Sequence, residues 1–211
     1  MSQVYIFDFD GTLVDSMPTY AAVMLRVARE NGIDGGAELV KIITPLGYRG
    51  TAEYFRAHGA PRSTEELLAA MQGYIRVEYE ERIGEKAGVS ETLQTLCAQG
   101  ASLNVLTASP HSVLDPCLGR LGIADFFDNI WSCDDFGIGK DNPEIYRMAA
   151  ARLGVDVADV IFVDDNSGAV QTAKAAGMQV YGIYDDSSAA YAAEIKATAH
   201  RYLATFRELL G

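Results

Sequence analysis

A short apolar stretch that ends in two acidic residues constrains the fold of this chain more than any other feature. Residues 4–13 read VYIFDFDGTL. The first four are apolar or aromatic, with β-branched residues in alternate positions, which is typical of a strand buried on both faces. The apolar run stops at Asp8, Asp10 follows two positions later, and Gly11 lets the backbone turn without a Cβ penalty. The stretch therefore predicts a central strand that ends in a polar turn.

The two aspartates after this strand indicate a functional site. In extended backbone, residues two apart point to the same side, so the carboxylates of Asp8 and Asp10 can converge on one spot. The carboxyl ends of buried strands are where open α/β sheets bind ligands. The alternative is that the two acids merely mark a solvated strand exit. We favour a site because both acids point to the same side of the chain and come directly after a fully apolar strand.

The overall composition limits the classes of ligand. The 211 residues are enough for one domain, or for one domain with a small insert, and 49% of them are hydrophobic. The formal net charge of −12 argues against a nucleic acid or an anionic membrane as a partner. An anionic ligand therefore needs local positive charge or a metal ion at its site.

The cysteines and the N-terminus favour a cytoplasmic protein. Cys97, Cys117 and Cys133 are odd in number and show no close pairing, as expected of reduced core residues. The first three residues lead directly into the predicted strand, which leaves no room for a signal peptide, and no apolar run approaches membrane-spanning length. We expect a cytoplasmic location, and a monomer is compatible with the sequence.

Residues 16–84 predict an all-helical insert after the first strand. Apolar residues recur at helical spacing, and no convincing strand occurs between Asp15 and Glu85. Ser63 and Glu66 form the reciprocal capping pair of a helix start. Helices are expected between Pro18 and Gly32, at 37–43, at 51–57 and from Ser63 onward. Such an insert is typical of a small bundle or lid.

The remainder of the chain alternates strands with helices. Strands are expected at 102–106, 130–131, 160–163, 179–183 and 201–203. Helices are expected at 90–99, 115–121, 142–153, 169–176 and 187–198, with Thr205 and Glu208 capping a last one. This order predicts an α/β fold: a Rossmann-like parallel-sheet core formed by 1–15 and 85–211, interrupted by the helical insert.

Polar residues also follow the second strand and precede one helix. Thr107-Ala108-Ser109 comes after the strand at 102–106, where a hydroxyl near the N–H groups of a helix start can bind an anion or simply cap the helix. Lys140 lies in the loop before the helix at 142–153. It is either a solvated charge or the cation of the same pocket.

A second acidic pair follows the strand at 160–163. Asp164 and Asp165 are adjacent, so they face opposite ways in an ideal strand, and we expect one to bind and the other to orient. Repulsion among Asp8, Asp10 and Asp165 raises their pKa values unless a cation is present. A hard divalent ion with oxygen ligands resolves this conflict, and Mg²⁺ is the expected cofactor for a phosphate substrate.

The order Asp8-x-Asp10-Gly-Thr, Thr107, Lys140, Asp164-Asp165 resembles the haloacid dehalogenase-like superfamily, in its phosphoglycolate phosphatase and β-phosphoglucomutase-like branch. The resemblance covers the whole chain, and the segment FDFDGTLVDS is its most specific part. It implies that the insert is a cap domain that sets substrate specificity.

The resemblance also implies a role for each site residue. Asp8 is the nucleophile that forms an aspartyl-phosphate, and Asp10 is the acid and base for the leaving oxygen and the attacking water. Mg²⁺ is held by the carboxylates of Asp8 and Asp165 and by the backbone carbonyl of Asp10. Thr107, the N–H of Ala108 and Lys140 bind the phosphoryl oxygens. Asp164 orients Lys140 or a water molecule in the metal shell.

Two positions depart from the family pattern. The residue after Thr107 is usually Asn or Ser, and here it is Ala108, so one polar contact is lost while the backbone N–H remains. Lys140 is commonly followed by proline, and here Asp141 follows it. An acid beside the lysine weakens its positive charge at the phosphate.

Substrate preference is expected to reside in the insert. Residues 44–50 predict a glycine-punctuated loop in which Arg49, with Tyr48 beside it, pairs with a second anionic group of the substrate or is simply exposed. The expected function is Mg²⁺-dependent hydrolysis of a small phosphorylated metabolite resembling phosphoglycolate or a sugar phosphate. The alternatives are a phosphomutase, a receiver-like phospho-acceptor module, and a metal-dependent binding protein without turnover.

Overall fold

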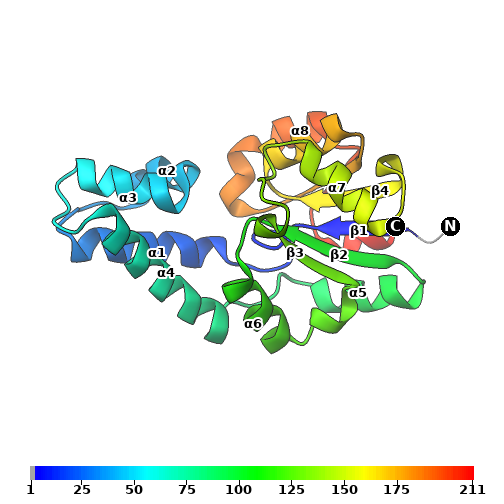
Figure 1. The fold of residues 1–211 in the computed structure, drawn as a ribbon, viewed down its shortest axis with the longest axis horizontal. Coiled ribbons are helices and arrows are strands. Elements are labelled where there is room, and N and C mark those ends of the chain that lie inside the picture. The colour runs from blue at the N-terminus through cyan, green and yellow to red at the C-terminus, as the bar shows by residue number, and fades with distance from the viewer. Residues whose placement is uncertain (1–2) are drawn as a thin grey trace. The chain divides into compact units, whose positions relative to one another are not determined.

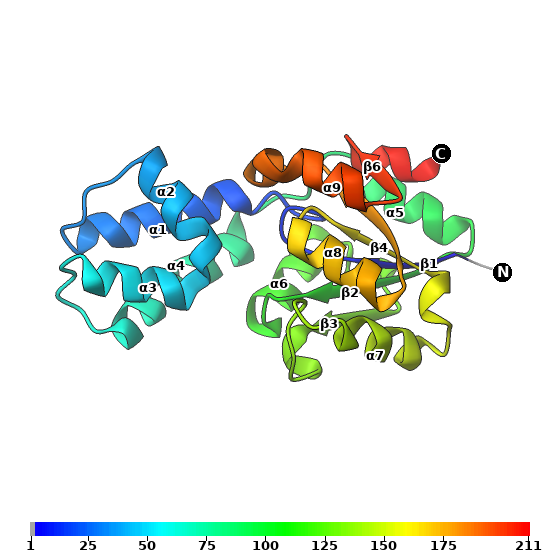
Figure 2. The same ribbon diagram turned by 90° about the horizontal axis from the view of Figure 1, so that it is seen from above.

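The computed structural model describes residues 3–211, which form two compact units. One unit consists of the segment that ends at Asp15 together with Gly84–Gly211, and the other is Ser16–Ile83. Figures 1 and 2 show a sheet with helices in the first unit and helices alone in the second. Each unit is described separately below.

The first unit is built on one six-stranded parallel sheet. Its strands run in the order β3-β2-β1-β4-β5-β6, and every neighbouring pair is parallel. This order, with the first strand in the interior and a reversal beside it, is that of a Rossmann-like doubly wound sheet, so the predicted fold class is confirmed. The strands are β1 (Val4–Phe7), β2 (Ser102–Thr107), β3 (Asn129–Ser132), β4 (Val160–Asp164), β5 (Gln179–Ile183) and β6 (Arg201–Leu203).

Helices cover both faces of this sheet. In Figure 1, α5 and α6 lie on one face and α7 and α8 on the other. The helices of this unit are α5 (Val89–Ala98), α6 (His111–Leu121), α7 (Glu144–Leu153), α8 (Ser167–Ala176) and α9 (Ala192–Thr198). Short 3-10 turns occur at η2 (Ala124–Phe126), η3 (Cys133–Asp135), η4 (Val157–Asp159), η5 (Asp186–Tyr191) and η6 (Phe206–Leu210).

The alternation of side chains along β1 determines which face its terminal acid occupies. Ile6 belongs to the buried cluster formed with residues of α7 and α8, whereas the Phe7 ring packs on Phe206 with centroids 5.5 Å apart. Phe162 of β4 lies in the same cluster as Ile6. Because the side-chain period of a strand is two, Asp8 and Asp164 continue the rows of Ile6 and Phe162. Both acids therefore emerge toward the side that carries α7.

The register of β1 and β4 brings these two acids to one level. Phe7 is paired with Val163, and the N–H of Asp8 donates to the Val163 carbonyl at 2.9 Å. Asp8 and Asp164 thus follow a matched pair of residues at the point where the strand order reverses. This point is where doubly wound sheets bind ligands.

The second unit is a group of helices: α1 (Met17–Glu30), α2 (Ala37–Ile43), α3 (Gly47–Ala57) and α4 (Thr64–Glu81), with a 3-10 turn η1 (Thr44–Leu46). Helix α4 packs against α1 and α3. The capping pair at its start is confirmed, since Ser63 Oγ accepts from the N–H of Glu66 at 3.2 Å and the Glu66 carboxylate accepts from the N–H of Ser63 at 2.7 Å.

The segment 44–50 is not the loop that its glycines and proline predict. It forms η1 and then, from Gly47, the first turn of α3. The buried Thr51 explains the short connection, because its hydroxyl donates to the carbonyl of Ile43 at 3.1 Å and draws α3 onto the end of α2. Tyr48 and Arg49 therefore lie on a helix and not in a flexible turn.

Three helix predictions in the first unit differ from the structure in where the helix starts or in its type. Helix α6 begins at His111 and not at Asp115, so Pro116 lies inside it and not in its first turn. Thr205 makes no side-chain capping bond; instead the Glu208 carboxylate accepts from the N–H of Ala204 at 3.2 Å. The element that follows is a short 3-10 turn, which has different spacing from the α-helix assumed for a capping pair. The segment 187–198 is likewise divided into η5 and α9.

Candidate active site

The carboxyl ends of β1 and β4 form a buried ionic group around Lys140. Its ammonium nitrogen lies 2.5 Å from Oδ1 of Asp8 and 2.8 Å from Oδ2 of Asp164. The Asp164 side chain is fully buried, and those of Asp8 and Lys140 are 7% and 14% exposed. Burial alone lowers the pKa of Lys140, but the carboxylates of Asp164 and Asp8 raise it well above its ordinary value. Lys140 is therefore a permanent cation.

The fold places Lys140 through its backbone. The lysine lies in the loop between η3 and α7, and the hydroxyl of the buried Tyr146 donates to its carbonyl oxygen at 3.1 Å. The same hydroxyl is 3.2 Å from the carbonyl of Ala169 in α8. Asp141, the residue after the lysine, is exposed. The acids that raise the pKa of Lys140 are thus Asp164 and Asp8.

Asp165 completes a compact group of three acids. Carboxylate oxygens of Asp8, Asp164 and Asp165 lie within 4.8 Å of one another, and all three residues are buried. Burial raises the pKa of Asp165 well above its ordinary value, and the charges of Asp164 and Asp8 raise it further. Burial likewise raises the pKa of Asp8 to about 7, against the opposing effect of Lys140. Among the residues that the structure describes here, the one ammonium group of Lys140 accompanies three carboxylates, so the ionised group has an excess of negative charge.

These acids fit a hard divalent cation. Oxygen ligands at this density are what Mg²⁺ and Ca²⁺ bind. Asp164 is already engaged on both oxygens, because Oδ2 pairs with Lys140 and Oδ1 accepts from the N–H of Asn166 at 2.7 Å. Asp165 accepts a longer bond on Oδ1, from the Thr12 hydroxyl at 3.3 Å. Within the acidic group, the contacts of Asp164 are those of an orienting residue.

Asp10 is held by a serine that follows β2. The Ser109 hydroxyl donates to Oδ2 of Asp10 at 2.5 Å, and the N–H of Ser109 donates to Oγ1 of Thr107 at 3.0 Å. Thr107 is buried, and its hydroxyl proton remains available to an oxyanion because the oxygen serves as the acceptor in this bond. Ala108, between the two, is exposed.

Ser109 is the residue of this group that we did not single out from the sequence. The sequence contained one signal for Ser109: it is a second hydroxyl-bearing residue, two positions after Thr107, at the same strand exit. Which acid that hydroxyl contacts is set by the turn after β1, and a turn's path is not readable from periodicity.

His111 is the first residue of α6, two positions after Ser109. Its Nδ1 is 2.8 Å from Oδ1 of Asp115, and its Nε2 is 2.9 Å from Oδ2 of Asp135. The hydrogen bonds with Asp115 and Asp135 raise the pKa of His111 above its ordinary value. A protonated imidazolium donates to both acids, so the charged form is the one that this arrangement stabilises.

The two candidate specificity residues belong to the helical unit. The Tyr48 ring packs edge-on against Tyr20, with centroids 5.3 Å apart. Arg49 is exposed on the first turn of α3. The acidic group, Asp10, Thr107 and Lys140 belong to the other unit.

Comparison with known proteins identifies the family. A family model for haloacid dehalogenase-like hydrolases matches residues 3–177. A phosphoglycolate phosphatase of Salmonella typhi is 32% identical over 199 residues, which cover 84% of this chain and 79% of the relative. The chain is a haloacid dehalogenase-like hydrolase. It belongs to the phosphoglycolate phosphatase and β-phosphoglucomutase-like branch, which decides against a receiver-like module and against a binding protein without turnover.

Other relatives agree on the fold and the class. A phosphorylated carbohydrates phosphatase of Thermotoga maritima is 29% identical over 183 residues, covering 86% of this chain and 85% of the relative. Two solved structures share the fold: CbbY of Rhodobacter sphaeroides with xylulose-(1,5)bisphosphate (TM-score 0.82, 22% identity, covering 99% of this chain and 96% of that one) and β-phosphoglucomutase of Clostridium difficile (TM-score 0.77, 20% identity, 99% and 93%).

Two further sequence expectations concern the cysteines and membrane spans. The three cysteines are free, and Cys117 and Cys133 are buried, as the odd count predicts. Among the described residues 3–211, none of the helices combines the length and the apolar character needed to span a bilayer.

Proposed function

We propose that this hydrolase is a Mg²⁺-dependent phosphatase that acts on a small phosphorylated metabolite through an aspartyl-phosphate intermediate. The observation that carries the proposal is the buried group at the carboxyl ends of β1 and β4, where three acids lie around one ammonium ion. Such a group binds a metal and an oxyanion side by side. The family and the phosphatase relatives support this class of reaction.

Asp8 is the proposed nucleophile. An oxygen of its carboxylate attacks phosphorus, the bond to the leaving oxygen breaks, and water later releases inorganic phosphate from the aspartyl-phosphate. Lys140 contacts Oδ1 of Asp8, which orients the carboxylate before attack. Lys140 and the Thr107 hydroxyl then stabilise the charge that spreads over the phosphoryl oxygens, together with the N–H of Ala108.

Asp10 is the proposed acid and base. It protonates the leaving oxygen during formation of the intermediate and accepts a proton from the attacking water during its hydrolysis. The hydrogen bond from the Ser109 hydroxyl to Oδ2 of Asp10 helps to orient this carboxylate.

The site fits a magnesium ion by its charge and its donor atoms. Asp8, Asp165 and the backbone carbonyl of Asp10 are the proposed ligands, and Asp164 orients Lys140. When bound, the ion neutralises charge between the nucleophile and the phosphate and polarises a phosphoryl oxygen.

Release of phosphate from p-nitrophenyl phosphate tests this proposal. We expect turnover that depends on Mg²⁺, is abolished by EDTA and returns when Mg²⁺ is restored. Asp8→Asn is expected to lower kcat by at least about 10³-fold, since it removes the nucleophile. Asp134→Asn is the matched control, because Asp134 is an exposed acid outside the site. Full activity of the Asp8 variant, or turnover that is indifferent to metal, contradicts the proposal.

We further propose that the helical unit, 16–83, sets the substrate preference, with phosphoglycolate or sugar phosphates as the class. Arg49 is an exposed cation on a helix start and can pair with a second anionic group of the substrate. In a panel of phosphorylated metabolites, Arg49→Ala is expected to change the order of preference more than it changes activity on p-nitrophenyl phosphate. Arg76→Ala, an exposed arginine of α4, is the control.

The same panel separates hydrolysis from its alternative. An isomerised sugar phosphate in place of inorganic phosphate indicates a phosphomutase. If Arg49→Ala lowers the activity on every compound by the same factor, this arginine has a structural role. The cytoplasmic location remains a prediction for localisation experiments. Sedimentation measures the oligomeric state, and a monomer is compatible with the sequence.

A further inference from the structure

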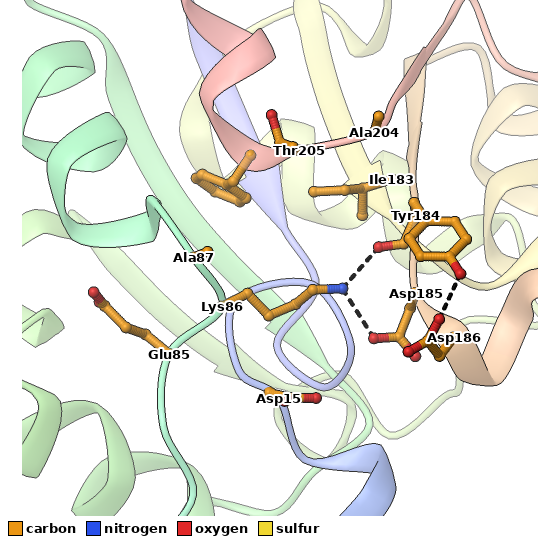
Figure 3. Close-up of a pocket in the computed structure, with 11 residues that line it drawn as sticks. Asp15, Glu85, Lys86, Ala87, Ile183, Tyr184, Asp185, Asp186, Ala204 and Thr205 are labelled. Atoms are coloured by element: carbon orange, nitrogen blue, oxygen red, sulfur yellow. Dashed lines mark hydrogen bonds and ion pairs between the residues drawn. The ribbon is translucent and has the colours of Figure 1, made fainter.

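Lys86 is a largely buried lysine outside the family motifs, in the segment where the chain returns from the helical unit to the α/β unit. Its side chain is 18% exposed. The ammonium group donates to the Gly11 carbonyl at 2.6 Å, the Tyr184 carbonyl at 2.8 Å and Oδ2 of Asp185 at 2.9 Å. Because an ammonium group has three protons, all of its donors are occupied. Figure 3 shows Lys86 reaching Tyr184 and Asp185. These three residues are among those that line a pocket of about 270 Å³.

The acceptors of Lys86 are themselves anchored. Tyr184 and Asp185 directly follow β5, and Oδ1 of Asp185 accepts from the N–H of Ser187 at 2.9 Å and from its hydroxyl at 2.6 Å. The Asp185 side chain is only 6% exposed. A buried, charge-assisted pair with fixed partners has little freedom to rearrange. Lys86 is therefore a rigid link between the end of β5 and the carbonyl of Gly11.

The backbone of Lys86 binds the same turn. Its N–H donates to the carbonyl of Leu13 at 2.9 Å. The turn is closed internally, because the N–H of Gly11 donates to the Val14 carbonyl at 3.0 Å and the N–H of Val14 donates to the Phe9 carbonyl at 3.0 Å. Side chain and backbone of one residue thus hold two carbonyls of the turn 9–14.

This turn carries Asp10 and lies against Asp165. Gly11 has φ +77, and a Cβ on it would lie 2.7 Å from Oδ1 of Asp165, so its backbone is in direct contact with the acidic group. Asp10 is the residue immediately before Gly11. A small movement of the Gly11 carbonyl therefore moves the carboxylate of Asp10 relative to Asp165 and to Ser109.

We propose that Lys86 is a positioning residue for the reaction: by holding the Gly11 carbonyl it keeps Asp10 in the place from which it protonates the leaving oxygen. The inference rests on the proposed role of Asp10 as acid and base. A lysine suits the task because three carbonyl and carboxylate oxygens converge on one point, where a neutral side chain cannot supply three donors.

The test uses the dependence of general acid catalysis on the leaving group. p-Nitrophenolate is a good leaving group and needs little protonation, whereas an alkoxide needs it strongly. The quantity measured is the ratio of kcat/KM for p-nitrophenyl phosphate to kcat/KM for an alkyl phosphate that the panel identifies as a substrate. A loss of folded protein lowers both values equally and leaves this ratio unchanged.

Lys86→Met is expected to raise the ratio about tenfold, a part of the roughly 10²–10⁴-fold that a general acid contributes. Lys86→Arg, which keeps the charge and several donors, is expected to return it close to the wild-type value. Lys174→Met is the matched control: Lys174 also donates to a backbone carbonyl, that of Thr198 at 2.5 Å, but it lies in α8 outside the site. Asp10→Asn is expected to raise the ratio more than any other variant.

The outcomes separate this inference from the proposed function. If Asp10→Asn raises the ratio and a folded Lys86→Met does not, the role of Lys86 is refuted and that of Asp10 stands. If Asp10→Asn itself leaves the ratio unchanged, the acid role fails and the inference fails with it. Equal shifts in the Lys86 and Lys174 methionine variants also overturn the inference.

Asp185→Asn replaces Lys86→Met if that variant does not fold. It removes the anionic acceptor of the ammonium group and keeps both carbonyl acceptors. The expected rise in the ratio is then about threefold, because the asparagine amide replaces a charge-assisted hydrogen bond to Lys86 with a weaker neutral one. An unchanged ratio in folded Asp185→Asn refutes the positioning role.

Discussion

Asp8→Asn should make the metal-free protein more stable while it removes the activity. Three buried carboxylates lie within 4.8 Å of one another, and Lys140 is the ammonium ion that contacts two of them. The charge on Asp8 is therefore disfavoured by Asp164 and Asp165 and favoured by Lys140. Asparagine keeps the shape of the side chain and still accepts a hydrogen bond from the lysine, but it carries no charge.

The magnitude follows from the distances. With an effective dielectric constant of about 20, each like-charge pair within 4.8 Å costs about 3.5 kcal/mol or more, and the attraction to Lys140 at 2.5 Å contributes about 6–7 kcal/mol. These contributions nearly cancel, which leaves the desolvation of a buried carboxylate, several kcal/mol, as the net cost of the charge. We expect the substitution to recover part of this, about 2 kcal/mol. For a chain of this length, that corresponds to a rise of about 4–8 °C in Tm.

Urea denaturation in EDTA at about pH 8.5, above the pKa of about 7 for Asp8, measures this effect with the carboxylate ionised. Asp134→Asn, an exposed acid-to-amide change, is the control and should leave the free energy of unfolding within about 0.5 kcal/mol of wild type. With saturating Mg²⁺ the stability advantage of Asp8→Asn over the wild type should shrink or reverse, because the ion stabilises the protein that has all its ligands.

A metal-free Asp8→Asn protein that is less stable than wild type would refute this reasoning. It would mean that the attraction between Asp8 and Lys140 outweighs burial and both repulsions, so that Lys140 stabilises the acidic group without a metal ion. A variant that gains as much from Mg²⁺ as the wild type would instead place the ion away from Asp8.

Three further predictions concern the turn, the serine and the histidine. Gly11→Ala should destabilise the protein by about 2 kcal/mol or more and abolish activity, as urea denaturation and phosphate release will show, because alanine at φ +77 is strained and its Cβ meets the Asp165 carboxylate. Ser109→Ala should lower kcat about tenfold by removing one hydrogen bond that orients Asp10, with Ser109→Thr as the control that keeps the hydroxyl; an unchanged kcat contradicts the importance of this contact. His111 has a raised pKa in the folded protein, so its stabilising effect is fully present below its unfolded pKa of about 6.5 and is lost as the pH rises through the folded value. The stability difference between wild type and His111→Ala should accordingly shrink between about pH 6 and pH 8, and a difference that grows contradicts this sign.

The sequence by itself determined the elements and the chemistry at their ends. Apolar β-branched runs are a local signal, and three strands, β1, β5 and β6, have the predicted bounds. The capping pair at Ser63 is also local, since both partners lie within one turn. The acids and the lysine were identifiable because each stands at an abrupt change from apolar to polar residues, and parallel strands all present their carboxyl ends at one edge.

Only the tertiary structure decided which of these groups touch. The side chain of Lys86 reaches Gly11, and Ser109 reaches Asp10, across separations of 75 and 99 residues. The buried hydroxyl of Thr51 made a helix start out of a segment whose glycines predict a loop. Periodicity reports which face of an element is buried, but contacts between loops depend on strand order, register and turn path. Those are set by packing of the whole core, and no local stretch of sequence encodes them.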